Sequence, residues 1–161
     1  MMLPTVTLLV LLFAPVYGDI CVEASDVMAA EQCHDEAYHN HLYFTGCPSM
    51  PCRPRLGNEY TLNVHFRPSH GARRPRVKFA LVFDFGHPSV DFLEREDSGA
   101  CQYLNVTCPI EAGQYVSYNH TFTLPRKDVY STVPVKIEWQ LYDPSQRQKL
   151  ACVRVPVHMI Y

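Results

Sequence analysis

The amino-acid sequence predicts an all-β domain, built as a sandwich of two antiparallel sheets and held by disulfide bonds. Three observations lead to this prediction: short segments that alternate apolar and polar residues, thirteen scattered prolines in 161 residues, and seven cysteines. Alternation puts apolar side chains on one face of a strand, and scattered prolines disfavour long helices. Several one-faced strands bury their apolar faces most economically as two packed sheets.

Six segments carry the alternation. It is clear in Glu59–Arg67, Arg76–Phe85, Thr132–Tyr142 and Leu150–Tyr161, and weaker in Tyr38–Thr45 and Gln114–Thr123. The side chains expected to face inward include Tyr60, Phe66, Val77, Phe79, Phe83, Ile137, Trp139 and Val155. Periodicity alone does not separate a filled core from the wall of a pocket, so both interpretations stay open at this point.

A true immunoglobulin domain is disfavoured by the order of its marker residues. That domain places a tryptophan between two cysteines that bridge the sheets. Here the only tryptophan, Trp139, comes late and is followed only by Cys152.

Residues 1–18 are typical of a secretory signal peptide. The apolar run Val6–Ala14 is too short to span a bilayer, and cleavage is expected before Asp19. A buried N-terminal strand is the alternative. We therefore expect a short extension over 19–32, a folded domain over 33–161, and a secreted protein, with the lysosome as a second destination. Sequons at Asn105 and Asn119 agree with glycosylation in the secretory pathway.

The cysteines indicate a disulfide framework, since an exported chain meets an oxidising compartment. Spacing does not decide the pairing, but it favours two local bridges, Cys47 with Cys52 and Cys101 with Cys108. Cys33 and Cys152 would then join the two ends of the domain, and Cys21 is left over. Cys21 could be free, blocked by a small thiol, or linked to a second chain; otherwise we expect a monomer.

Signals for catalysis, metals and cofactors are weak. Motifs for a serine hydrolase, a zinc protease or a phosphate-binding loop do not occur. The cysteine spacings differ from those of zinc modules, and His39 and His41 share a strand face without an evident third ligand. The net charge of −2 gives no reason to expect a nucleic-acid partner. We expect no enzyme activity, no metal and no cofactor.

The sequence contains one cluster of basic residues. Arg73, Arg74, Arg76 and Lys78 follow one another closely beside Gly71 and two prolines. The cluster is interpreted either as a solvated hairpin turn or as a patch for anionic lipid head groups, glycans or a donor membrane.

A set of motifs along nearly the whole domain resembles the ML lipid-recognition family, most closely the Niemann–Pick type C intracellular cholesterol transporter 2 group. The matching features are Cys47-Pro48-x-x-Pro51-Cys52, Cys108-Pro109-Ile110, Tyr115–Tyr118, Leu124-Pro125, Tyr130, Glu138–Leu141, and Cys152 with Val155-Pro156-Val157. The resemblance implies an immunoglobulin-like sandwich whose sheets part around a lipid. It also implies the bridges Cys33–Cys152, Cys47–Cys52 and Cys101–Cys108.

The same resemblance assigns a lipid site and a partner class. It places the aromatic residue of the pocket entrance at Phe92 and the pocket tyrosine at Tyr130, and it puts an aliphatic position at Arg126. The wall is expected from the inward residues Phe66, Phe79, Phe83, Ile137, Trp139 and Val155. The expected ligand is a sterol or similar lipid, delivered to a membrane or a membrane-protein acceptor. Arg126 departs from the family pattern and favours, as the alternative, an innate-immune or chemosensory module for microbial or acidic amphiphilic lipids.

Overall fold

The computed structural model describes residues 31–33, 38–47, 50–83, 89–92, 99–127, 130 and 133–161, and of residues 38–41 only the backbone. The predicted signal peptide and Cys21 therefore lie outside the described residues, as do Phe85 and the acidic stretch 94–97.

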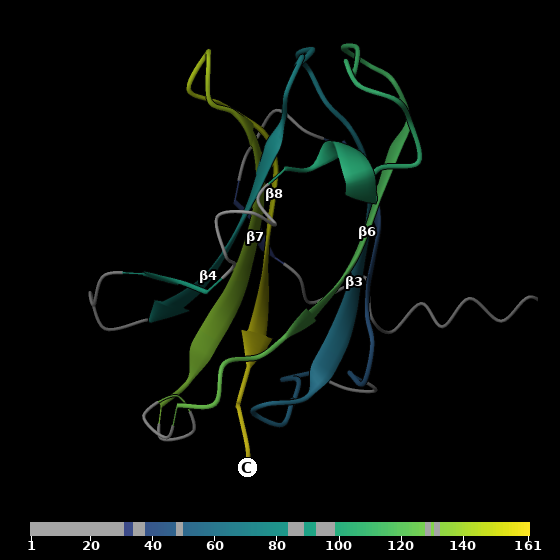
Figure 1. Cartoon of the computed structure of the whole chain (residues 1–161). Coiled ribbons are helices and arrows are strands. Elements are labelled where there is room, and N and C mark those ends of the chain that lie inside the picture. Colours follow the sequence, from purple (N-terminus) through teal and green to yellow (C-terminus); the bar gives the residue numbers. More distant parts are fainter. Residues whose placement is uncertain are drawn as a thin grey trace, which may run out of the picture.

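Two antiparallel sheets form the domain, as the alternation predicts, and they face each other as two layers (Figure 1). The five-stranded sheet has the order β1-β8-β7-β4-β5, and the three-stranded sheet has the order β2-β3-β6. Their strands are β1 (Glu31–Gln32), β2 (Tyr38–Phe44), β3 (Glu59–Arg67), β4 (Arg76–Phe83), β5 (Val90–Asp91), β6 (Val116–Thr123), β7 (Val135–Asp143) and β8 (Gln148–Val157). A short 3-10 helix, η2 (Cys101–Tyr103), precedes β6.

Strand pairing brings the apolar halves of the patterns to the inside. In the five-stranded sheet Phe79 of β4 lies opposite Trp139 of β7, which in turn lies opposite Val153 of β8. In the three-stranded sheet Phe66 of β3 lies opposite Val116 of β6. All five side chains are at most 2% exposed, so the two faces form one interior between the sheets.

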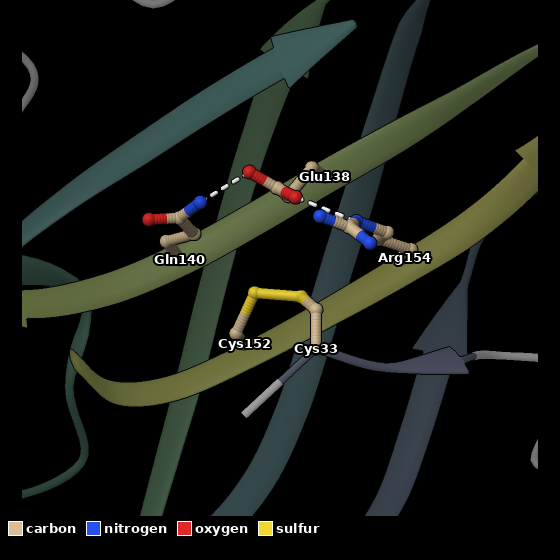
Figure 2. The surroundings of a disulfide bond; sticks show 5 residues. All are labelled: Cys33, Glu138, Gln140, Cys152 and Arg154. Carbon is tan, nitrogen blue, oxygen red and sulfur yellow. Dashed lines mark hydrogen bonds and ion pairs between the residues drawn. A yellow bond between two sulfur atoms is a disulfide. The ribbon is translucent and has the colours of Figure 1, made fainter. Parts of the chain in front are cut away.

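Three disulfide bonds join Cys33 to Cys152, Cys47 to Cys52, and Cys101 to Cys108, which confirms the expected pairing. The first connects the segment after β1 to β8 on the outer face of the five-stranded sheet (Figure 2). Beside it, Arg154 donates a hydrogen bond to the buried carboxylate of Glu138, with a nitrogen–oxygen distance of 2.6 Å. Gln140 donates to the other oxygen of the same carboxylate.

The sandwich has two distinct ends (Figure 1). At one, here called the hairpin end, lie the β7–β8 turn, the segment 68–75 that joins β3 to β4, and the segment 109–115 that leads into β6. At the other, here called the Tyr130 end, lie residues 124–127, the start of β7 and the C-terminus, with Tyr130 beside the end of β4.

Candidate functional site

Aromatic side chains from both sheets meet in the middle of the sandwich. Phe79 of β4 and Phe122 of β6 lie with ring centroids 4.5 Å apart. Phe44 of β2 lies 6.0 Å from Phe122 and stacks on Tyr60 of β3 at 5.5 Å. At this level, side chains of the two sheets therefore touch each other. The interior here is lined by aromatic rings rather than by hydrogen-bonding groups.

Toward the hairpin end the interior is closed. The indole of Trp139 packs on Tyr118 at 5.0 Å and on Phe66 at 5.9 Å, and all three residues are at most 1% exposed. The indole nitrogen of Trp139 has no hydrogen-bond partner among the described residues. Tyr118 donates to or accepts from Nδ1 of His120 at 2.7 Å, and the His120 ring stacks on Tyr103 at 3.8 Å.

Toward the Tyr130 end the aromatic lining reaches the surface. Phe83, at the end of β4, lies 6.2 Å from the ring of Tyr130 and is only partly buried. Phe92, just after β5, is also partly buried and lies 5.7 Å from Phe79 and 5.8 Å from Phe122. Phe92 thus connects the surface to the contact between the two sheets, whereas Phe83 and Tyr130 form a separate ring contact at the end of β4.

Two cations lie at this rim. Lys127 places its ammonium nitrogen 5.9 Å from the centroid of the Tyr130 ring. Arg126 is exposed and lies over Gly57, where an added Cβ would be 2.9 Å from Nε of Arg126. Gly57 has a φ of +79°, which glycine adopts freely. The left-handed backbone favours glycine at this position, and the guanidinium occupies the space that a side chain would take.

The structure distributes the predicted site residues over this interior. Phe79, Ile137 and Val155 lie on the buried face of the five-stranded sheet, and Phe66 and Trp139 lie in the closed part. Phe83 and Tyr130 lie together at the Tyr130 end, with Arg126 on the exposed rim, whereas Phe92 lies beside Phe79 at the edge of the five-stranded sheet. No described contact shows which of them a ligand would touch.

Phe122 and Phe44 are absent from the predicted site residues, although Phe44 belongs to the apolar set of a predicted strand and both complete the contact between the sheets. Both lie in the segments of weaker alternation. In β6 the inward set is Val116, Tyr118, His120 and Phe122, and the histidine disguises an otherwise regular apolar pattern. A count that allowed one buried polar residue would have found it.

The acidic and metal-ligating side chains of the described residues do not form a reactive centre. Glu138, Cys33 and Cys152 offer ligand atoms within 4.8 Å of one another, but the two sulfurs are bonded to each other, so neither is a thiolate. Asp143 is 3% exposed, and its carboxylate accepts hydrogen bonds from the hydroxyl and the amide of Ser145. These hydrogen bonds, the hydroxyl's first, lower the pKa of Asp143 below its ordinary value of 3.8, against the opposing effect of burial.

Comparison with known proteins agrees with this architecture. The profile of the ML domain matches residues 27–159, which is most of the chain. The chain belongs to the ML domain family. NPC intracellular cholesterol transporter 2 of Danio rerio is 32% identical over 114 residues, which cover 71% of this chain and 72% of that protein. The protein of the same name from Bos taurus is 28% identical over 114 residues, covering 70% and 71%.

A solved structure shares the ML-domain fold. A Niemann–Pick type C2 protein from the Japanese carpenter ant superposes with a TM-score of 0.67 at 18% identity, over 81% of this chain and 98% of that chain. Among the described residues, none forms a helix that is long and apolar enough to cross a bilayer.

Proposed function

We propose that this ML-domain protein is a non-enzymatic, secreted carrier that holds a sterol or similar lipid between its two sheets. The observation that carries the proposal is the series of ring contacts from the partly buried Phe92 to the Phe79–Phe122 contact inside. Membership of a family whose matched relatives are named cholesterol transporters supports it.

Burial of apolar surface supplies enough free energy for tight binding. A sterol-sized ligand that buries about 400 Å² of apolar surface gains about 10 kcal/mol at about 25 cal/mol per Å². Association and the ordering of side chains reduce this gain. Separating the rings of Phe79 and Phe122 costs about 1 kcal/mol more, because aromatic pairs contribute about that much beyond their buried area. Submicromolar binding remains within reach without any reactive group.

Opening should begin between the β5 edge and the end of β4, because the partly buried rings of Phe92 and Phe83 lie there. Phe83 and Phe92 can move outward without exposing the closed part around Trp139, where three rings interlock at 1% exposure or less. A lipid would then insert its apolar end between Phe79 and Phe122, while its polar group stays near Arg126 and Lys127.

The only tryptophan provides the test of this proposal, because Trp139 lies inside the sandwich. Titration of the mature protein with dehydroergosterol should give energy transfer from Trp139 to the sterol, saturating at one ligand. Phe92→Asp should weaken binding, because Phe92 is only partly buried and a carboxylate there must be desolvated as the lipid enters. Ile110→Ala, a buried change at the hairpin end, serves as the control and should bind sterol normally. Absence of transfer in the wild type would exclude the proposal.

Native mass spectrometry of the protein secreted from cultured cells tests the remaining parts of the proposal. It should report a bound lipid, cleavage before Asp19, the state of Cys21, and glycans on Asn105 and Asn119, both of which are exposed. Retention of the full chain inside the cells would contradict secretion without bearing on lipid binding.

A second candidate ligand is an acidic amphiphile rather than a neutral sterol. Arg126 and Lys127 at the rim favour it, because both cations lie where the polar head group of a bound lipid would emerge. Competition between cholesterol and a long-chain fatty acid for the dehydroergosterol site discriminates the two. Arg126→Ala should weaken only the fatty acid if its carboxylate meets the guanidinium.

A further inference from the structure

We propose that the hairpin end of the sandwich is a docking surface for a sulfated glycan. The sequence places Arg73 and Arg74 in the segment that joins β3 to β4. The fold adds Arg147 and Lys149, which are distant in sequence, because the β7–β8 turn lies at the same end (Figure 1). None of these four cations has an ion pair with a carboxylate among the described residues.

Three of these four cations line two surface pockets, both of which are formed in part by the β7–β8 hairpin. One has a volume of about 420 Å³ and is lined by Arg73 together with Asp143, Ser145 and Gln146 of the turn. The other has a volume of about 350 Å³, and Arg147 and Lys149 line it with other residues of the same hairpin. An elongated anion that crosses the turn would meet a cation in each pocket, whereas a single small anion would meet one.

The described residues at this end carry a net positive charge although the whole chain carries −2. Arg76 lies opposite Tyr142, which lies opposite Lys149, so the basic surface continues across three strands. Arg67 also belongs to this end, where it donates to the carbonyl of Gly113. The described carboxylates here are Asp143, whose oxygen is held by Ser145, and Glu111. Among the described residues of this end, basic side chains thus outnumber acidic ones, which favours a polyanionic partner.

Arg147 adopts an unfavourable backbone conformation in the turn. Its φ is 54°, and it is the one residue other than glycine with a positive φ among the described residues. This region is disfavoured for side chains other than glycine, asparagine and aspartate, so an arginine here lowers stability relative to glycine. An arginine that adopts an unfavourable backbone conformation beside a pocket indicates a role in binding rather than in stabilising the fold.

The chemistry of the surface selects the glycan over other polyanions. Guanidinium groups match the planar pairs of oxygens that sulfate presents. Three disulfides indicate an oxidising compartment, where sulfated glycans are met rather than nucleic acids. A membrane is disfavoured because, on the proposed function, lipid leaves at the Tyr130 end. A protein partner would need an apolar centre, whereas Tyr115 is the one large exposed hydrophobic among the described residues here, with Arg67 over its ring.

The test measures binding of the mature protein to a heparin-derived oligosaccharide by isothermal titration calorimetry over a range of NaCl concentrations. Wild-type affinity should fall steeply as salt screens the charges. The double variant R73A/R147G should bind about fivefold to tenfold more weakly, since it removes one cation from each pocket. Arg53→Ala is the matched control, because Arg53 is exposed and lies near the Tyr130 end. The residue before it, Cys52, forms an isolated β-bridge with Val157, the last residue of β8.

A thermal readout on the single variant R147G separates binding from a structural role. It should raise the melting temperature by about 2 °C, since glycine relieves the positive φ, while it weakens oligosaccharide binding. Equal affinity of wild type and R73A/R147G would overturn the proposal, as would binding to phosphatidylserine vesicles without binding to the oligosaccharide. Sterol titration of the same variants should be unchanged, so failure of lipid carriage and failure of glycan docking give different results.

Discussion

Phe79 and Phe122 belong to different sheets, and their ring centroids lie 4.5 Å apart. This contact joins the two sheets between the partly buried ring of Phe92 and the buried cluster around Trp139. Because both rings are apolar and make no hydrogen bond, the energy that holds the sheets together here is of the kind that a lipid can replace.

Phe122→Ala should lower the free energy of unfolding by about 3–5 kcal/mol, since it leaves a cavity in the core. It should also increase the rise in melting temperature caused by sterol, because the ligand then fills space that the ring occupied. Thermal denaturation with and without dehydroergosterol measures both effects. Ile110→Ala should cost a comparable amount, about 2–5 kcal/mol, without the larger ligand effect. An equal ligand effect in both variants would show that lipid does not reach Phe122.

On the outer face, truncation of the Glu138–Arg154 pair should be asymmetric. Glu138 has a side chain that is 5% exposed, whereas that of Arg154 is 36% exposed. Arg154→Ala leaves a buried carboxylate with Gln140 as its remaining side-chain donor, and we expect a loss of about 2 kcal/mol. Glu138→Ala leaves a guanidinium that water can reach, and we expect about 1 kcal/mol.

Urea denaturation of both variants measures this difference. Arg154→Met, which keeps much of the apolar stem, separates the loss of charge from the loss of packing. Equal losses in the Arg154→Ala and Glu138→Ala variants would mean that the carboxylate finds water once its partner is gone.

Stability should depend on pH through Asp143. Its pKa is lowered in the folded protein by the hydroxyl of Ser145, so the ionised carboxylate favours folding at pH values above 3.8. This contribution is lost as the pH falls below 3.8 through the lowered folded pKa. Asp143→Asn should therefore cost about 1 kcal/mol at neutral pH, and the difference from wild type should shrink in acid.

Urea denaturation at neutral pH and in acid provides the measurement for Asp143. Ser145→Ala removes the hydroxyl donor and should show the same pH trend. A cost of Asp143→Asn that stays constant into acid would assign the loss to packing instead of to the charge.

The three disulfides should contribute unequally. Removal of Cys33–Cys152, with a sequence separation of 119, should cost about 5 kcal/mol under the chain-entropy model. Removal of Cys47–Cys52, with a separation of 5, should cost about 2 kcal/mol on the same basis. Paired serine variants and chemical denaturation test the ranking. A larger loss for the short loop would indicate that this bridge acts through the packing of the folded state.

Local pattern was sufficient for the main strands and insufficient for the smallest ones. β3 was predicted with its observed bounds because Tyr60, Leu62, Val64 and Phe66 alternate without interruption. β1 and β5 each contain two residues, which are too few to show an alternation of apolar and polar side chains. They exist because β8 and β4 offer free edges for pairing.

The sequence predicted the kind of site, an interior lined by aromatic residues, but it identified only some of the residues that form it. Inward aromatics could be named from alternation, but the partner of Phe79 could not, because Phe122 reaches it from the other sheet. The resemblance placed Arg126 at the pocket entrance, and only the fold shows that its guanidinium lies over Gly57 on the exposed rim.

The order of residues along the chain decided which side chains each strand buries, because alternation is a property of neighbours in sequence. It also supplied the seven cysteines that make a cross-linked sandwich possible. The tertiary structure alone decided which rings touch across the sheets, and which basic residues gather around the β7–β8 turn. Those relationships depend on strand pairing between distant segments, and pairing is set by the summed packing of whole faces instead of by any local pattern.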